Sequence, residues 1–526
     1  MEERKSLIGR AGVVATGTLV SRILGLARDM VFAAVFRKEE TDAFFAAFTF
    51  PNALRQLLGE GAVSSAVVPV MAATLESEGK ERTAAFYARL RGAFFLLSVV
   101  LTVLAMVFAR PFTRLFAGGY EGEAFERTVS MTRWVFPYIV FISSASLGAA
   151  ALNTNRKFAL TAFAPALLNI AFIVCAFVFP SFFAARGIDP GHAMVVGALV
   201  GGILQAVVQV PALRRIGFGG MFRFRGKDPL VSEVFRRLLP MLLGVGIYYV
   251  DLVLSRSFLS SEGAGAQSYF TWASRICDFP QGIFVLAISS VALPSLSALA
   301  KRADWTEFDR TVSLGLRLSL FVAIPATVFV VWEALPLVRL FFERGKFNAE
   351  ASLETSRSLM FQGASIVCVT VVRQLVAAFH SMGNTRTPMW VSFWDLLVFV
   401  GAALFLRRTM GHAGIAAAVG LSSLAQAVLL GIRFASARSD FPWKEVLRSF
   451  GMVLGISAVG GSIASTVASS LALGSRMEAL LALVLFGMVF LLLSRVLKNE
   501  EWLEIESALQ RKLRRGKVVQ DPQRGP

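Results

Sequence analysis

The sequence is poor in the residues that build metal centres, disulfide frameworks and soluble surfaces. Among 526 residues there are three histidines and three cysteines, and charged residues make up 17%. Soluble domains average about 25% charged residues, so a soluble protein of this length is not expected. Cys175, Cys277 and Cys368 stand singly in apolar runs without a C-x-x-C pair, which indicates packing residues rather than a metal or redox centre.

Enzyme signatures are also missing. The sequence contains no Walker A motif, no G-x-S-x-G and no H-E-x-x-H, and its polar loops are too short for a nucleotide-binding domain. The net charge of +18 comes from short Lys and Arg segments between apolar runs, which is typical of cytoplasmic loops and not of a nucleic-acid surface. We therefore expect no enzyme, no nucleic-acid partner and no cofactor.

Long apolar runs dominate what is present. Hydrophobic residues make up 55% of the chain, and runs near the ~20 residues needed to cross ~30 Å of hydrocarbon recur from end to end. This pattern predicts an all-α polytopic membrane protein with about fourteen transmembrane helices. The predicted spans are 11–36, 43–72, 92–116, 131–152, 159–183, 191–213, 235–258, 267–298, 312–335, 356–380, 388–406, 412–434, 447–471 and 478–497.

The loop charges predict an orientation. Loops on the side of the termini carry most of the Lys and Arg, as at 80–91, 214–237 and 433–448, whereas 118–126 and 260–267 on the other side are acidic or neutral. The positive-inside rule then places both termini in the cytoplasm. Residues 75–91, LESEGKERTAAFYARLR, additionally predict a short interfacial helix that anionic lipid would attract.

An internal repeat divides the chain. AFF (43–45) and SSAVVP (64–69) return as SYF (268–270) and SSVALP (289–294) at a constant offset. Repeats that run in the same direction predict two pseudo-symmetric lobes of six helices, an arrangement found in alternating-access transporters. The predicted parts are an N-terminal lobe (1–213), a cytoplasmic inter-lobe linker (214–234), a C-terminal lobe (235–434), two additional helices (435–498) and a basic cytoplasmic tail (499–526).

Three arginines lie inside the first hydrophobic hairpin. Arg22 and Arg28 belong to the first span and Arg55 to the second. A charge at mid-membrane costs at least ~2.5–3.5 kcal/mol, so such residues indicate a functional site. Guanidinium groups stay protonated when desolvated and bind phosphate in a bidentate manner, which favours a buried diphosphate as the ligand.

Other polar residues accompany these arginines in the second span. Asp42, Asn52 and Glu60 lie there, and Pro51 removes a backbone hydrogen bond beside Asn52. We expect them to support the arginines. The alternative is that the charges only pair among themselves, Arg28 with Asp42 and Arg55 with Glu60.

The repeat places a fourth arginine in the eighth span. Arg275 could face the first lobe's arginines across a cavity, although Asp278 three residues later permits a purely local ion pair. Asp251 and Asp395 are carboxylates in apolar runs of the second lobe. They suggest a cation site or proton relay, with a structural role as the alternative.

Several of these stretches resemble one family. SRILGLARD (21–29), the motif that begins TDAFFAAFTFPNALRQ and extends over 41–69, ASRICDFPQGI (273–283) and FFERGKF (341–347) are similar to the MurJ (MviN) lipid II flippases of the MOP exporter superfamily. The resemblance covers essentially the whole chain. It implies a flippase that moves lipid II, the undecaprenyl-diphosphate-linked peptidoglycan precursor, from the inner to the outer leaflet of the bacterial cytoplasmic membrane.

The resemblance also implies roles for particular residues. The family's cavity arginines correspond to Arg22, Arg28, Arg55 and Arg275, and its cavity acids to Asp42 and Glu60 with Asn52 beside them. The two extra helices, roughly 447–497, would form a groove for the lipid tail. A sodium site in some members has an aspartate that corresponds to Asp251, and Asp395 corresponds more loosely to another ligand.

Two other functions remain open from the residues alone. A flippase for another undecaprenyl-diphosphate oligosaccharide would need the same diphosphate grip, and a cation-coupled multidrug exporter would share the fold. Sodium or the membrane potential could drive the cycle. We expect a monomer in contact with membrane lipids and with the cell-wall synthesis machinery.

Overall fold

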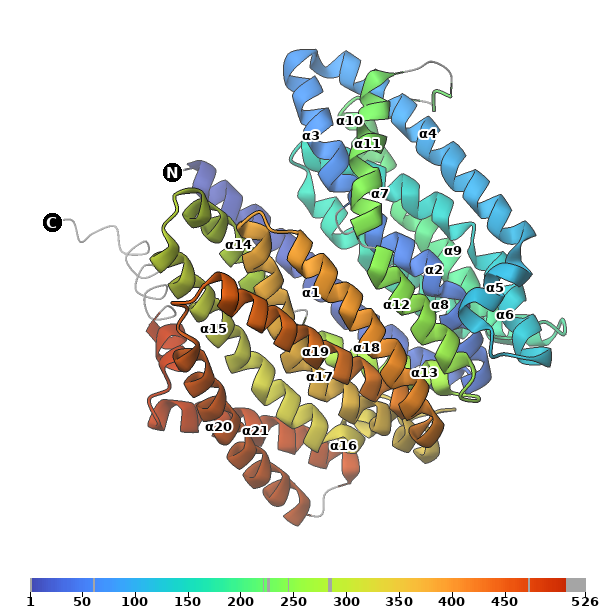
Figure 1. Ribbon diagram of the computed structural model, residues 1–526. Helices are drawn as coiled ribbons and strands as arrows, with labels where there is room; N and C mark the ends of the chain where they lie inside the picture. Colours follow the sequence, from blue (N-terminus) through green and yellow to red (C-terminus); the bar gives the residue numbers. More distant parts are fainter. Residues whose placement is uncertain are drawn as a thin grey trace, which may run out of the picture. The chain divides into compact units, whose positions relative to one another are not determined.

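The apolar runs fold as helices, because a helix bonds all of its backbone N–H and C=O groups within one segment where no water is available. The computed structural model describes residues 2–59, 62–220, 222–224, 228–244, 246–281, 286–471 and 474–507. Within these ranges the regular structure is helical, with no strand (Figure 1). The predicted all-α class is therefore confirmed.

The helices of the first half are α1 (Glu2–Val35), α2 (Lys38–Gly59), α3 (Ala62–Ser77), α4 (Gly79–Val107), α5 (Ala109–Ala117), α6 (Gly122–Val135), α7 (Tyr138–Thr154), α8 (Phe158–Ala184), α9 (His192–Val207), α10 (Val210–Arg215), α11 (Pro229–Gly244) and α12 (Gly246–Ser260). Those of the second half are α13 (Ala266–Pro280), α14 (Leu286–Lys301), α15 (Trp305–Trp332), α16 (Ala334–Phe341), α17 (Ala349–Ser381), α18 (Arg386–Met410), α19 (His412–Ala437), α20 (Trp443–Ser470) and α21 (Ser475–Val496).

Eleven segments of the described chain are long and apolar enough to cross a membrane, and they coincide with eleven of the fourteen predicted spans. The other three predicted spans, 11–36, 235–258 and 267–298, fall on α1, on α11 with α12, and on α13 with α14. Charged side chains lower the hydropathy of α1. The other two spans include residues outside the description, at 245 and 282–285. A total of fourteen is consistent with this structure.

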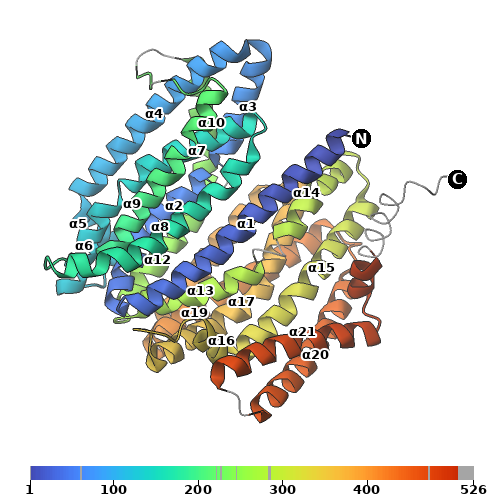
Figure 2. The same cartoon turned by 180° about the vertical axis from the view of Figure 1, so that it is seen from behind.

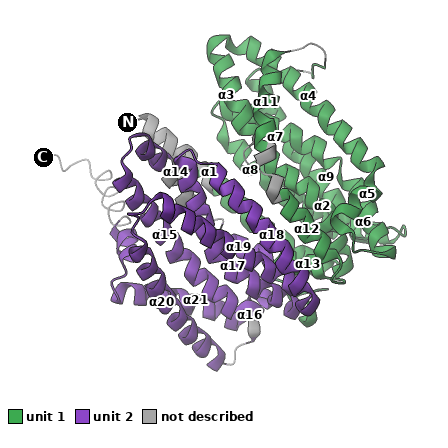
Figure 3. Cartoon of the chain, viewed as in Figure 1, with its two compact units in different colours: residues 1–272, 342–351 green, residues 273–341, 352–526 purple. Residues whose placement is uncertain are grey.

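The chain packs as two compact units (Figure 3). Unit 1 contains residues 1–272 and 342–351, and unit 2 contains residues 273–341 and 352–526. Helix α13 contributes to both units, since the boundary follows Trp272. The predicted division into lobes of 1–213 and 235–434 remains a prediction, because packing units report contacts and not repeat symmetry.

In unit 1, helices α3, α4, α7 and α11 share one buried core. Phe86, Leu90 and Phe94 of α4 pack in it with Met71 and Leu152. Helix α4 begins at Gly79 and continues without interruption to Val107. The prediction of a separate interfacial helix over 75–91 is therefore wrong: most of these residues form the first turns of a spanning helix.

In unit 2, the two additional helices pack on α15 and α16, as both views show (Figures 1 and 2). Phe321 and Phe329 of α15 lie 5.1 and 5.2 Å, ring centroid to centroid, from Phe490 and Phe486 of α21. Gly461 of α20 faces Trp332, where an added Cβ would lie 3.6 Å from the indole. Small residues opposite large rings allow the close van der Waals packing that holds helices together in lipid.

Candidate functional site

Small residues bring α1 against α8 in unit 1. A Cβ added to Gly17 would lie 2.7 Å from the carbonyl oxygen of Ala162, so only glycine allows the two backbones to approach there. Two turns later, a Cβ at Gly25 would meet the Asn169 amide at 3.7 Å, which is ordinary contact. This crossing places the arginine-bearing part of α1 beside the polar side chain of α8.

Arg28 is fixed by three different kinds of contact. Its Nε and Nη2 donate to Asp29 Oδ1 at 2.9 and 2.8 Å, and its Nη1 donates to Asn169 Oδ1 at 3.2 Å. The guanidinium carbon lies 5.4 Å from the centroid of the Phe172 ring. Asp29 is fully buried, whereas 13% of the Arg28 side chain is exposed. The plane of the guanidinium is thus set before any ligand arrives.

Asn169 is the site residue that the sequence reasoning missed. Its Nδ2 donates to the Ser21 carbonyl oxygen at 2.9 Å while its Oδ1 accepts from Arg28, so it ties α8 to α1 at two points. An asparagine in the otherwise apolar run 159–183 was the available signal.

The second span supplies Arg55 and its neighbour. Arg55 Nε donates to Asn52 Oδ1 at 3.0 Å, one turn away on α2, and both side chains are half-buried. Asn52 therefore accepts a hydrogen bond that orients Arg55, and its role in a ligand site stays a prediction. Arg22 is half-buried on α1. Glu60 lies outside the described residues, and so does its predicted pairing with Arg55.

Asp42 binds the start of another helix. Its carboxylate accepts hydrogen bonds from the backbone N–H groups of Gly265 and Ser268, the latter at 2.8 Å, and from the Ser268 hydroxyl at 2.6 Å. These groups form the N-terminus of α13, where a carboxylate is favoured by otherwise unbonded N–H groups and by the helix dipole. The alternative pairing of Arg28 with Asp42 is wrong, since Asp29 pairs with Arg28 and α13 binds Asp42.

This geometry predicts a stability effect at Asp42. We expect Asp42→Ala to lower the free energy of unfolding by about 2 kcal/mol or more, because buried N–H groups of α13 lose their acceptor. Asp304→Ala is the control: Asp304 caps α15 from an exposed position and should cost about 1 kcal/mol or less. Thermal unfolding in detergent measures both, and equal losses would contradict the buried role.

The remaining predicted residues are distributed over both units. Arg275 Nη1 lies 3.7 Å from Asp278 Oδ2, so the local ion pair exists. Because Arg275 belongs to unit 2 and the other three arginines to unit 1, a cavity shared by all four stays a prediction. Asp251 is half-buried on α12 of unit 1, and Asp395 is half-buried on α18 of unit 2. Within the described chain, no group of three or more His, Cys, Asp or Glu side chains could hold a metal ion.

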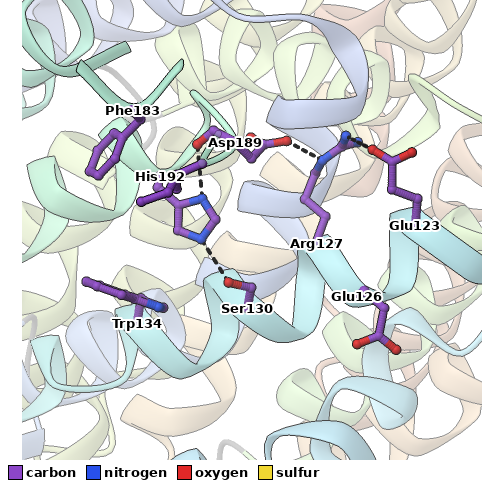
Figure 4. Close-up of a pocket in the computed structure, with 9 residues that line it drawn as sticks. Glu123, Glu126, Arg127, Ser130, Trp134, Phe183, Asp189 and His192 are labelled. Carbon is purple, nitrogen blue, oxygen red and sulfur yellow. Dashed lines mark hydrogen bonds and ion pairs between the residues drawn. The ribbon is translucent and has the colours of Figure 1, made fainter. Parts of the chain in front are cut away.

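A pocket of about 420 Å³, lined by charged and apolar side chains, lies between α6 and the start of α9 (Figure 4). Arg127 binds Asp189 through Nε and Glu123 through Nη2, and His192 Nε2 hydrogen-bonds the Ser130 hydroxyl at 2.9 Å. Its charges are largely satisfied by one another. These contacts hold α6 against the turn before α9.

A serine–histidine contact also occurs in unit 2, there through the other ring nitrogen. The Ser358 hydroxyl of α17 lies 2.8 Å from His412 Nδ1, and His412 begins α19 as His192 begins α9. Each histidine stands in the sequence Gly-His-Ala. This second repeated feature, unrecognised in the sequence, supports the proposed two-lobe repeat.

Comparison with known proteins identifies the family. The family model described as lipid II flippase MurJ matches residues 32–485. The chain belongs to the MurJ family. A lipid II flippase MurJ of Burkholderia cenocepacia is 32% identical over 461 residues, which cover 86% of this chain and 88% of that protein. A probable lipid II flippase MurJ of Bdellovibrio bacteriovorus is 32% identical over 521 residues, 95% of this chain and 98% of that one.

Solved structures share the fold. A MurJ structure in an inward closed conformation has a TM-score of 0.77 at 24% identity and covers 93% of this chain and 99% of its own. A MATE-family transporter of the MOP superfamily in an inward-facing conformation has a TM-score of 0.64 at 16% identity, covering 80% and 96%. The MurJ family and the MATE exporters are thus variants of one all-helical architecture.

Proposed function

We propose that this protein moves lipid II from the inner to the outer leaflet of the bacterial cytoplasmic membrane by alternating access. Membership of the MurJ family carries the proposal. It is supported by relatives that are named lipid II flippases or probable lipid II flippases and that match this chain over most of their length. A flippase for another undecaprenyl-diphosphate glycan and a multidrug exporter have no comparable support, since the MATE likeness concerns the fold alone.

The arginines supply the chemistry that a diphosphate requires. Arg28 presents a guanidinium whose orientation is set by Asp29, Asn169 and Phe172. Because the group is already oriented, little side-chain entropy is lost when a phosphate binds. Arg22 of α1 and Arg55 of α2 would add positive charge, and Arg275 would add a fourth guanidinium from α13. The charge of the ligand would then offset repulsion between these arginines.

The proposal also includes the remaining expectations from the sequence. The protein acts as a monomeric transporter without catalytic chemistry, with both termini in the cytoplasm and the lipid tail beside α20 and α21. Asp251 and Asp395 are each candidate sodium ligands in this proposal, with the membrane potential as the other driving force. Lipid II and the surrounding membrane lipids are its ligands, and cell-wall synthases are its protein partners.

Depletion of the protein from its host tests the function. We expect lysis and accumulation of lipid II in the inner leaflet, measured by the accessibility of labelled lipid II to an external probe. Loss of surface polysaccharide without lysis would indicate another lipid-linked glycan, and drug sensitivity alone would indicate an exporter. Re-expression of the wild-type chain is the control and should restore growth and lipid II accessibility.

A further inference from the structure

A second cavity of about 420 Å³ lies in unit 1 between α4 and the segment that precedes and begins α11. We call it the linker cavity. It is lined by Arg89, Leu96, Arg223, Phe224, Asp228 and Ser232, among others. It has no part in the arginine site described above. Its walls are a spanning helix on one side and the predicted inter-lobe linker on the other.

Within the described part of the linker, the backbone of Arg223 is fastened to α4. The N–H of Arg223 donates to the carbonyl oxygen of Ala88 at 3.1 Å, and a Cβ added to Gly92 would lie 2.4 Å from the Arg223 carbonyl oxygen. The Arg91 guanidinium carbon lies 4.4 Å from the centroid of the Phe222 ring. These contacts fix the backbone at Arg223 while its side chain stays exposed. The backbone of the cavity wall is therefore fixed, while the Arg223 guanidinium can still reach a ligand.

The cavity carries more positive than negative charge. Its carboxylate is Asp228, which is buried and shared by Arg82 Nη1 at 2.8 Å and Arg89 Nη1 at 2.9 Å. The hydrogen bond from Arg82 is the main cause that lowers the pKa of Asp228 to about 2, so this carboxyl is ionised at neutral pH. Arg223 adds a further charge to the same lining. An anion is the complementary ligand.

An apolar surface begins where the cavity ends. Leu96 is 57% exposed, and the exposed side chains Val100, Leu104 and Val107 continue from it along α4. Phe224 is 61% exposed beside them. Since α4 is apolar enough to span the membrane, this face meets acyl chains. The arginines stand at the basic end of that helix, where the positive-inside rule places the cytoplasmic head groups.

We propose that the linker cavity binds an anionic phospholipid of the cytoplasmic leaflet. Arg89 and Arg223 donate to the phosphate oxygens, since guanidinium–phosphate hydrogen bonds are charge-assisted and planar. The first part of an acyl chain lies along Leu96 and Phe224. Anionic lipid is concentrated in the cytoplasmic leaflet, which supplies the ligand at this depth. The bound lipid would hold the linker on α4.

Native mass spectrometry of the purified full-length chain tests this site. With phosphatidylglycerol added, we expect one lipid to bind tightly, and Arg223→Ala to weaken that binding about tenfold. Phe224→Ser should weaken it as well, because the acyl chain loses its contact. Arg215→Ala is the matched control, since Arg215 is an exposed arginine of α10 that does not line the cavity, and it should bind like wild type.

Two further measurements distinguish an anionic lipid from other ligands that carry phosphate. Phosphatidylcholine should bind more weakly than phosphatidylglycerol, and millimolar inorganic phosphate should not displace the lipid. Equal binding of both lipids, displacement by inorganic phosphate, or unchanged phosphatidylglycerol binding by a folded Arg223→Ala would each overturn the proposal. Thermal unfolding of each variant establishes that it is folded. None of these outcomes depends on lipid II transport.

Discussion

Arg28→Lys is expected to lower the rate of lipid II transport about 10- to 100-fold. Lysine keeps the positive charge but lacks the planar fork of donors, Nε, Nη1 and Nη2, through which Arg28 bonds Asp29 and Asn169. Loss of a charge-assisted hydrogen bond costs about 1.5–3 kcal/mol, and each ~1.4 kcal/mol on the barrier is a factor of ten. Arg28→Ala should abolish transport.

The comparison needs variants that separate charge from orientation. Asp29→Asn leaves the arginine in place with a weaker acceptor, so we expect an intermediate rate. Arg114→Lys is the matched control, because Arg114 also lies over an aromatic ring (Phe125, 5.2 Å) but belongs to α5. Growth rescue of a depleted strain and flipping in vesicles measure the effect at equal expression. Full rescue by Arg28→Lys would show that the guanidinium geometry is dispensable.

The helical fold was predictable because it depends on local composition, and the same composition selects the candidate arginines. An apolar run of about twenty residues has few alternatives to a spanning helix, and a charge within such a run is visible without any knowledge of packing. Arg22, Arg28 and Arg55 are found in this way. The end of a helix is harder to predict from the sequence. The charged side chains at 79–91 belong to the first turns of α4 and not to a separate interfacial helix.

Two contacts of these charged residues were not predictable, because the partners come from distant parts of the chain. Asn169 reaches Arg28 across 141 positions, and Asp42 reaches Ser268 across 226. The sequence offers many amides to Arg28, and only the packing of α1 on α8 selects Asn169 among them. The same holds for Ser130 and His192, which are 62 residues apart. Their repeat in unit 2 is recognised only after the first contact is known.

Packing also explains the motif FFERGKF. Residues 342–351, which include the start of α17, belong to unit 1, although α16 and the rest of α17 belong to unit 2. The Lys346 N–H donates to the Ala34 carbonyl oxygen at 2.9 Å, and the Phe347 ring lies 5.0 Å from that of Trp272. Gly345 has a φ of +59°, and an added Cβ would lie 2.2 Å from the Ala34 carbonyl oxygen. Glycine is required here by conformation and by space.

Gly345→Ala is therefore expected to lower the free energy of unfolding more than a glycine-to-alanine change at a positive φ where the added Cβ meets open space. Gly187 is the matched control, since its φ is +68° and nothing lies within 4 Å of an added Cβ. Gly187→Ala should lose only about 1–2 kcal/mol from the left-handed backbone. Gly345→Ala adds a clash with a backbone carbonyl, which must displace 342–351 from the end of α1.

Two measurements distinguish these outcomes. Thermal unfolding should show a clearly larger loss for Gly345→Ala than for Gly187→Ala, and limited proteolysis should cleave the 342–351 segment faster in that variant. Because the segment connects helices of one unit while it packs on the other, its release should also slow lipid II transport. Equal stability of the two variants, with unchanged proteolysis, would contradict this prediction. It would mean that the end of α1 shifts at little cost and that the contact between Gly345 and Ala34 does not hold the segment.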